Sequence, residues 1–129
     1  MCWHLQHFKG SWNGVGNPVY PPARRELAKH GISCEGKRAR QVNKEDYNNF
    51  DYLICMDKNN INSMKCIIGE DTEGKISLLL DYTESRGKSI ADPWYTGNFE
   101  ITYSDVFRGC EALLDYLLQK NRIYNISFL

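Results

Sequence analysis

Asp51-Tyr52-Leu53-Ile54-Cys55-Met56-Asp57 is the stretch from which the fold class follows. Apolar residues stand together between two acids, without the polar and apolar alternation of a strand that has one face in water. Such a run is typical of a strand buried on both faces, as in parallel sheets that helices cover. The rest of the chain is therefore expected to supply helices for both faces.

The sequence predicts helices on either side of this strand. Residues 59–68 follow it with helical spacing, and Asn43 before it stands where a helix cap belongs, with acids in the next turn. Further upstream, the prolines at 21–22 suit the first turn of a short helix, and Gly31 suits its C-terminal end. Helices and strands thus alternate along the chain.

The second half repeats the pattern. Residues 75–80 are predicted as a second buried strand, and residues 81–90 as a polar loop. Apolar residues then recur at helical steps, which predicts one helix with a single apolar stripe, capped by Thr102 or Ser104: Tyr103, Val106, Phe107, Cys110, Leu113, Leu114, Leu117 and Leu118. The order predicts an α/β fold, a three-layer sandwich with a parallel sheet. Two strands are too few for such a sheet.

Length and composition indicate one domain that remains in the cytoplasm. The chain has 129 residues and a formal net charge of +0, so no basic excess points to nucleic acid, and no apolar run is long enough to span a membrane. The five cysteines lack regular spacing, which favours reduced thiols. We expect no metal site, although His4 and His7 are close in sequence. We divide the chain into an atypical lead-in (1–13), an α/β domain (14–121) and a tail (122–129).

Ala91-Asp92-Pro93-Trp94-Tyr95-Thr96-Gly97 carries the candidate chemistry. Proline restricts its own backbone and that of the residue before it, so Asp92 is predicted on a stiff loop rather than within a helix. A carboxylic acid held beside aromatic rings suits a general acid that protonates an aromatic leaving group. The alternative is an Asp-Pro turn followed by aromatic residues that only pack.

Several motifs together resemble one family. Residues 16–24 (GNPVYPPAR), 36–41 (GKRARQ), 51–57 (DYLICMD), 78–82 (LLLDY) and 92–97 (DPWYTG) follow one another in the order seen in bacterial low-molecular-weight protein tyrosine phosphatases. The resemblance extends from about Gly14 to Leu118. It implies hydrolysis of phosphotyrosine in proteins or of small aryl phosphates through a cysteinyl phosphate, without a cofactor.

The resemblance also assigns roles to residues. It makes Asp92 the general acid that protonates the leaving phenolate and then activates water. Trp12 and Trp94 correspond to aromatic walls beside the phenyl ring of the substrate, and Tyr95 next to Trp94 favours the tyrosine-specific type over arginine phosphatases and arsenate reductases.

The nucleophile of that family has no counterpart here. Its phosphate loop, C-x5-R-S, follows the first strand, whereas six residues after Cys2 stands Phe8. Cys34 and Arg40 satisfy C-x5-R, but they follow a helix and a glycine instead of a buried strand, and we reject them as a phosphate loop. We interpret Cys55 and Cys66 as thiols of the core.

These absences lead to three expectations. The family sheet has four parallel strands, and this chain should lack the first and most of the second. The chain as given should be inactive, or serve as a binding or regulatory module that uses its aromatic surface or an open sheet edge. It should also be marginally stable or self-associate through the sheet. A misplaced start, a frameshift and a real deletion all remain open as origins of residues 1–13.

Overall fold

The computed structural model describes residues 16, 18–38, 40, 42–120 and 126–128. The elements along the chain are α1 (Pro21–Lys29), α2 (Lys44–Asn49), β1 (Tyr52–Cys55), α3 (Lys58–Ile68), β2 (Ile76–Leu78), the 3₁₀ helix η1 (Leu79–Tyr82), α4 (Pro93–Thr96), α5 (Phe99–Gln119) and β3 (Ile126–Phe128). Among the helices of these residues, none combines the length and apolarity needed to cross a bilayer.

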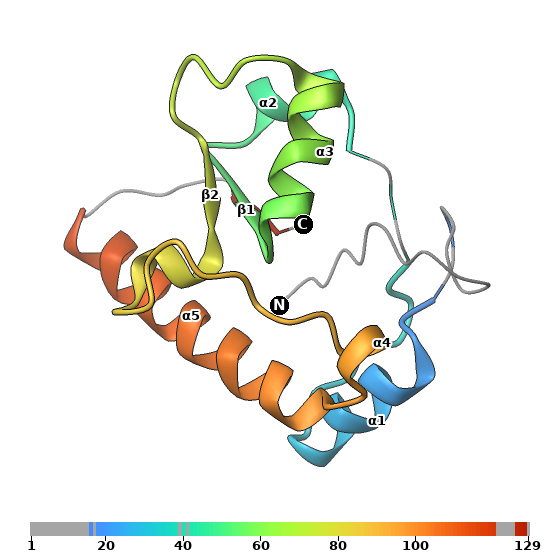
Figure 1. The fold of residues 1–129 in the computed structure, drawn as a ribbon. Coiled ribbons are helices and arrows are strands. Elements are labelled where there is room, and N and C mark those ends of the chain that lie inside the picture. The colour runs from blue at the N-terminus through green and yellow to red at the C-terminus, as the bar shows by residue number, and fades with distance from the viewer. Residues whose placement is uncertain (1–15, 17, 39, 41, 121–125, 129) are drawn as a thin grey trace.

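The described strands form one parallel sheet in the order β2-β1-β3. Side chains of β1 alternate between its two faces. Leu53 and Cys55 pack with Met64 of α3, whereas Ile54 packs with Val106 and Leu113 of α5. Figure 1 shows α3 and α5 on opposite sides of the sheet, and this arrangement confirms the expected α/β fold with a covered parallel sheet.

The segment that we expected as a tail contains strand β3 at Ile126–Phe128. These residues pair in parallel with β1, with Ile126 opposite Tyr52 and Ser127 opposite Leu53. The sheet thus has one strand more than the two we predicted, and fewer than the four that the resemblance implies. A strand of only three residues shows no periodicity from which it can be recognised.

The second predicted strand is shorter than expected. Extended pairing ends at Leu78, and Leu79–Tyr82 turns into a 3₁₀ helix. The turn forms because the Asp81 carboxylate accepts a hydrogen bond from the backbone N–H of Leu78 at 3.0 Å. The apolar run continues across the turn because Leu79 and Leu80 are buried against α5.

The predicted cap of α2 is confirmed. The Asn43 side chain accepts from the N–H of Asp46, and the Asp46 carboxylate accepts from the N–H of Asn43, at 3.0 and 2.9 Å. Asp57 and Asn60 form the same reciprocal pair at the start of α3. Two helices therefore begin where short polar side chains satisfy the first backbone N–H groups.

The prediction for the last helix needs two corrections. Asn98 rather than Thr102 or Ser104 caps α5, by accepting from the N–H of Ile101 at 3.0 Å. The apolar stripe is also only partly covered, since Phe107, Leu114 and Leu118 are 46%, 56% and 63% exposed. The apolar arc of α5 is wider than the surface that packs against it.

Candidate functional site

Two hydrogen bonds fix the segment that precedes Asp92. The backbone N–H of Ile90 donates to the carbonyl of Met56, immediately after β1, at 2.8 Å. The hydroxyl of Thr102 in α5 donates to the carbonyl of Ala91 at 3.1 Å. Asp92 therefore lies at the carboxyl end of the central strand, where parallel α/β sheets usually place their ligands.

Asp92 stands directly before a one-turn helix, α4. Its carbonyl accepts from the N–H groups of Tyr95 and Thr96 at 3.1 and 3.3 Å. Gly97 ends the turn with a φ of 72°, a conformation that suits glycine, and its N–H donates to the carbonyl of Pro93 at 2.8 Å. The Asp92 side chain is half-buried and has at least one interaction partner. The predicted stiff setting of Asp92 thus takes the form of a helix start.

The remaining predicted site residues are described to different extents. Tyr95 lies in the same turn as Asp92, and its side chain is 67% exposed. The backbone of Trp94 is part of α4, but its side chain lies outside the described part of the structure. Trp12 also lies outside the described residues. The structure therefore brings together Asp92 and Tyr95.

Sequence reasoning missed the side chains whose hydrogen bonds hold residues 81–90, the loop that leads to Asp92. Asp81 accepts from the N–H of Gly87 at 2.7 Å as well as from Leu78, and Ser89 accepts from the N–H of Lys58 at 3.1 Å. These bonds tie residues 81–90, which we predicted only as a polar loop, to β2 and α3. An acid immediately after a predicted strand was the available signal, because Asp commonly binds backbone N–H groups in turns.

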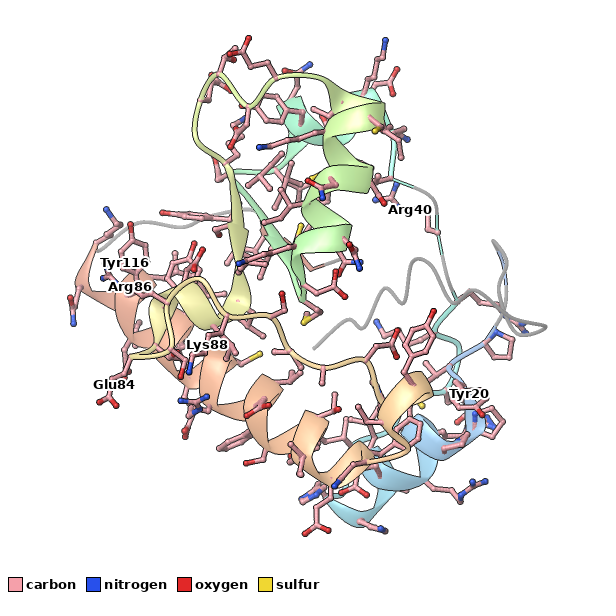
Figure 2. The ribbon with its side chains drawn as sticks, in the orientation of Figure 1. Tyr20, Arg40, Glu84, Arg86, Lys88 and Tyr116 are labelled. Carbon is pink, nitrogen blue, oxygen red and sulfur yellow. The ribbon has the colours of Figure 1, made fainter. Side chains whose placement is uncertain are left out.

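The two residues of the rejected C-x5-R pattern, Cys34 and Arg40, have structural roles. The Arg40 guanidinium donates to both carboxylate oxygens of Asp46, at 3.0 and 3.1 Å. Cys34 lies in the turn between α1 and α2. Figure 2 shows Arg40 on the α3 side of the molecule, away from α4 and the acid segment.

The two cysteines interpreted as core thiols differ. Cys55 is fully buried, and burial, together with the nearby negative charge of Asp57, raises the pKa of its thiol to about 12. Cys55 is therefore a protonated core thiol, as predicted. Cys66 is exposed on α3, so the interpretation of that residue is wrong. A cysteine within a helical apolar pattern does not by itself reveal which face it occupies.

A cleft of about 690 Å³ lies beside α4 but does not include Asp92. It is lined by one face of α1 and by the segment from α4 to the start of α5: Pro22, Arg25, Glu26, Lys29, Thr96, Gly97, Asn98, Phe99 and Glu100. Tyr20 borders this region, with its ring 6.0 Å from that of Phe99 (Figure 2). Within the described residues, no group of three or more His, Cys, Asp or Glu side chains is arranged to hold a metal ion.

Comparison with known proteins identifies the family. Residues 9–123 match the model of the family described as low molecular weight phosphotyrosine protein phosphatase. The chain is 38% identical over 115 residues to the low molecular weight protein-tyrosine-phosphatase YfkJ of Bacillus subtilis. The matched stretch covers 88% of this chain and 73% of YfkJ. It is 33% identical over 110 residues to PtpA of Staphylococcus aureus, with 85% and 69% covered.

Solved structures give the same result. The crystal structure of YfkJ superposes with a TM-score of 0.79, covering 88% of this chain and 71% of that one. The low molecular weight protein tyrosine phosphatase of Streptococcus pyogenes, 33% identical, has a TM-score of 0.71 with 84% and 68% covered. The chain belongs to the low-molecular-weight phosphotyrosine protein phosphatase family.

Proposed function

We propose that this chain carries the acid side of a site that hydrolyses aryl phosphate monoesters, with Asp92 as the general acid. The observation that supports this best is the attachment of the Asp92 segment to the carboxyl end of β1, through the bond from Ile90 to Met56. Thr102 holds the same segment from α5. An acid on such a support keeps its position while a leaving group is protonated.

The proposed chemistry divides between Asp92 and a nucleophile. The Asp92 carboxyl donates its proton to the phenolate oxygen as the phosphorus–oxygen bond breaks. The resulting carboxylate then takes a proton from the water that attacks the phosphorylated nucleophile, which restores the acid. Asp92 can thus serve both steps, but it cannot form the covalent intermediate itself.

The proposed substrate is a phosphotyrosine side chain or a small aryl phosphate. Tyr95 is 67% exposed and lies one helical turn from Asp92, which suits contact with a flat aromatic group. We assign the same contact to Trp94, its neighbour in sequence, and to Trp12. The two relatives compared above are protein-tyrosine-phosphatases by name, which agrees with this substrate class.

We further propose that the 129-residue chain alone does not hydrolyse aryl phosphates. Its sequence contains no C-x5-R-S, and the single C-x5-R pairs its arginine with Asp46. Without a thiolate the acid has no intermediate to serve, and loss of one member of such a unit usually removes most of the activity. Turnover of p-nitrophenyl phosphate by the purified chain tests this, and turnover that Asp92→Asn abolishes would contradict it.

A chimera tests the role of Asp92 separately. The residues of the Bacillus subtilis relative that precede its matched stretch are joined ahead of residue 9, where the family match begins, to supply the nucleophile. We expect this chimera to hydrolyse p-nitrophenyl phosphate, and Asp92→Asn to lower the rate about 10²- to 10⁴-fold. Asp105→Asn, on the half-exposed surface of α5, is the matched control and should leave the rate unchanged. An active chimera that is indifferent to Asp92→Asn would exclude the proposed acid.

A binding module is the second candidate function. The 67% exposure of Tyr95, in the same turn as Asp92, favours an aromatic surface at the acid segment that a partner can cover. Titration with phosphotyrosine, followed by tryptophan fluorescence, tests for a retained pocket. The absence of a saturable change up to millimolar ligand would exclude that pocket.

A further inference from the structure

Among the described residues, strand β3 pairs with one edge of β1. Its residues pair with Tyr52, Leu53 and Ile54, and the side chain of Ile126 also packs against the cluster beneath α5. It is separated from α5 by residues 120–125. It also lies beyond residues 9–123, which match the family model. β3 is therefore an addition to the part of the chain that matches the family.

The edge of β1 that β3 covers requires a strand. Leu53, Ile54 and Cys55 have no exposed surface, so the backbone groups of β1 are buried as well. Buried backbone N–H and C=O groups without partners are costly, and an uncovered strand edge pairs readily with another chain. When β3 leaves, another strand must replace it or the sheet edge must tolerate water.

β3 fits this edge imperfectly. Ser127, its central residue, is 5% exposed. Among the described residues, no hydrogen bond involves the Ser127 hydroxyl, and a buried hydroxyl without a partner costs about 1–3 kcal/mol. The parallel register places Ser127 beside Leu53, whose side chain belongs to the apolar cluster under α3. We therefore expect this three-residue strand, whose buried hydroxyl has no partner among the described residues, to open more easily than β2, whose central serine is hydrogen-bonded.

We propose that β3 is exchanged between two copies of this chain, so that Ile126–Phe128 of one copy pairs with Tyr52–Ile54 of the other. A second copy is the occupant that the structure specifies, because each copy carries the sequence that already pairs with this edge in parallel register. Exchange of β3 reproduces its pairing with β1 between the two copies and leaves the elements from α1 to α5 of each copy in place. The open edge thus becomes a reciprocal interface whose occupancy rises with protein concentration.

Mixed disulfide trapping tests the exchange directly. One full-length variant carries Tyr52→Cys and another carries Ile126→Cys, because these residues face each other in the register. Both also carry Cys66→Ser, which removes an exposed thiol. After mixing at high concentration and oxidation, we expect a covalent dimer in which mass spectrometry finds residue 52 joined to residue 126. Tyr52→Cys mixed with Glu111→Cys, an exposed position on α5, is the control and should give no such dimer.

A result in which the two mixtures give equal amounts of dimer, or no dimer, would overturn the proposal. A second measurement uses the unaltered chain, in case Tyr52→Cys prevents folding. Light scattering over a range of concentrations should detect a dimer, and an excess of a peptide with the sequence of residues 121–129 should convert it to monomer. The same peptide with Ile126→Asp should have no effect. A chain that stays monomeric at every concentration, or a dimer that ignores the first peptide, would contradict strand exchange.

Discussion

The two neighbours of β1 have the same length and direction but different support. β2 is held at both ends: the Asp71 carboxylate accepts from the N–H groups of Lys75 and Ile76, and Asp81 accepts from that of Leu78. Its central serine, Ser77, is hydrogen-bonded to the Tyr82 hydroxyl at 2.9 Å. β3 has a buried central serine with no such bond among the described residues.

This difference shows that pairing with β1 alone does not determine how firmly a strand is held. The backbone ladder to β2 and the ladder to β3 are each three residues long. Beyond the ladder, β2 gains side-chain acceptors at its ends and the packing of η1 against α5. We therefore expect substitutions on the β2 side to reduce the free energy of unfolding more than comparable substitutions in β3.

The largest effect is expected for Leu79→Ala. Leu79 follows β2, is fully buried and packs closely on Gly109, where an added Cβ would lie 2.5 Å from the Leu79 Cγ. Helix α5 can approach Leu79 closely because Gly109 has no side chain. Gly109 therefore offers no atoms to fill the cavity that alanine at position 79 would leave, and this cavity should persist. We expect a loss of about 2–5 kcal/mol in the free energy of unfolding, measured by urea denaturation. A loss below about 1 kcal/mol would show that this contact is not central to the fold.

The sequence predicted the β2 side of the molecule better than the β3 side for a physical reason. A helix cap such as Asn43 can be recognised from the next few residues, because its partner Asp46 is close in sequence. The buried strand Tyr52–Cys55 can be recognised because its residues are all apolar. β3 becomes a strand only through its partner, and Ile126–Phe128 alone has no distinguishing pattern. For the same reason the pattern of α5 did not reveal that Leu118 would remain uncovered.

The candidate site was predictable in part. The setting of Asp92 follows from two neighbours: Pro93 restricts the backbone directly after it, and Gly97 ends the turn with a positive φ. Its support by Thr102 was not predictable, since that hydroxyl reaches a carbonyl eleven residues away in sequence. Contacts of that kind depend on how α5 lies against the preceding segment.

The next largest effect on the free energy of unfolding is expected at Asp71, whose carboxylate binds the backbone N–H groups at the start of β2, and this effect depends on pH. Burial raises the pKa of Asp71, but hydrogen bonds from the Tyr47 hydroxyl and from backbone N–H groups, including those of Lys75 and Ile76, outweigh it and hold the pKa below its usual 3.8. The ionised carboxylate therefore stabilises the folded chain above pH 3.8, and this contribution is lost as the pH falls through the lower pKa of the folded state.

Asp71→Asn should accordingly cost about 1–2 kcal/mol at neutral pH and progressively less in acid. Urea denaturation of both chains at a series of pH values measures the difference. Glu70→Gln, an exposed neighbour, is the control and should show little change. A difference that stays constant or grows as the pH falls would contradict the role of the Asp71 charge.

A smaller effect is expected for Ile126→Ala on the β3 side. Ile126 is only half-buried and packs at the margin of the cluster beneath α5. We expect a loss of about 1 kcal/mol, because a half-buried aliphatic side chain contributes less than the roughly 1.5–3 kcal/mol of a fully buried one. Thermal unfolding followed by circular dichroism compares it with Leu79→Ala. Equal losses for the two variants would remove the distinction between the neighbours of β1.

The smallest effects should have opposite signs, and they give the sharpest form of the comparison. Ser127→Ala removes a buried hydroxyl that has no hydrogen bond among the described residues, so we expect the free energy of unfolding to rise by about 0.5–1 kcal/mol. Ser77→Ala makes the same chemical change in β2 but removes the bond to Tyr82, so it should lower that free energy by a similar amount. Because both serines sit at the centre of a three-residue strand beside β1, differences in strand propensity largely cancel between the two variants. Urea denaturation of the two variants in parallel with the unaltered chain measures both signs. If Ser127→Ala destabilises the chain as much as Ser77→Ala does, the Ser127 hydroxyl has a partner in solution, and β3 is held as firmly as β2.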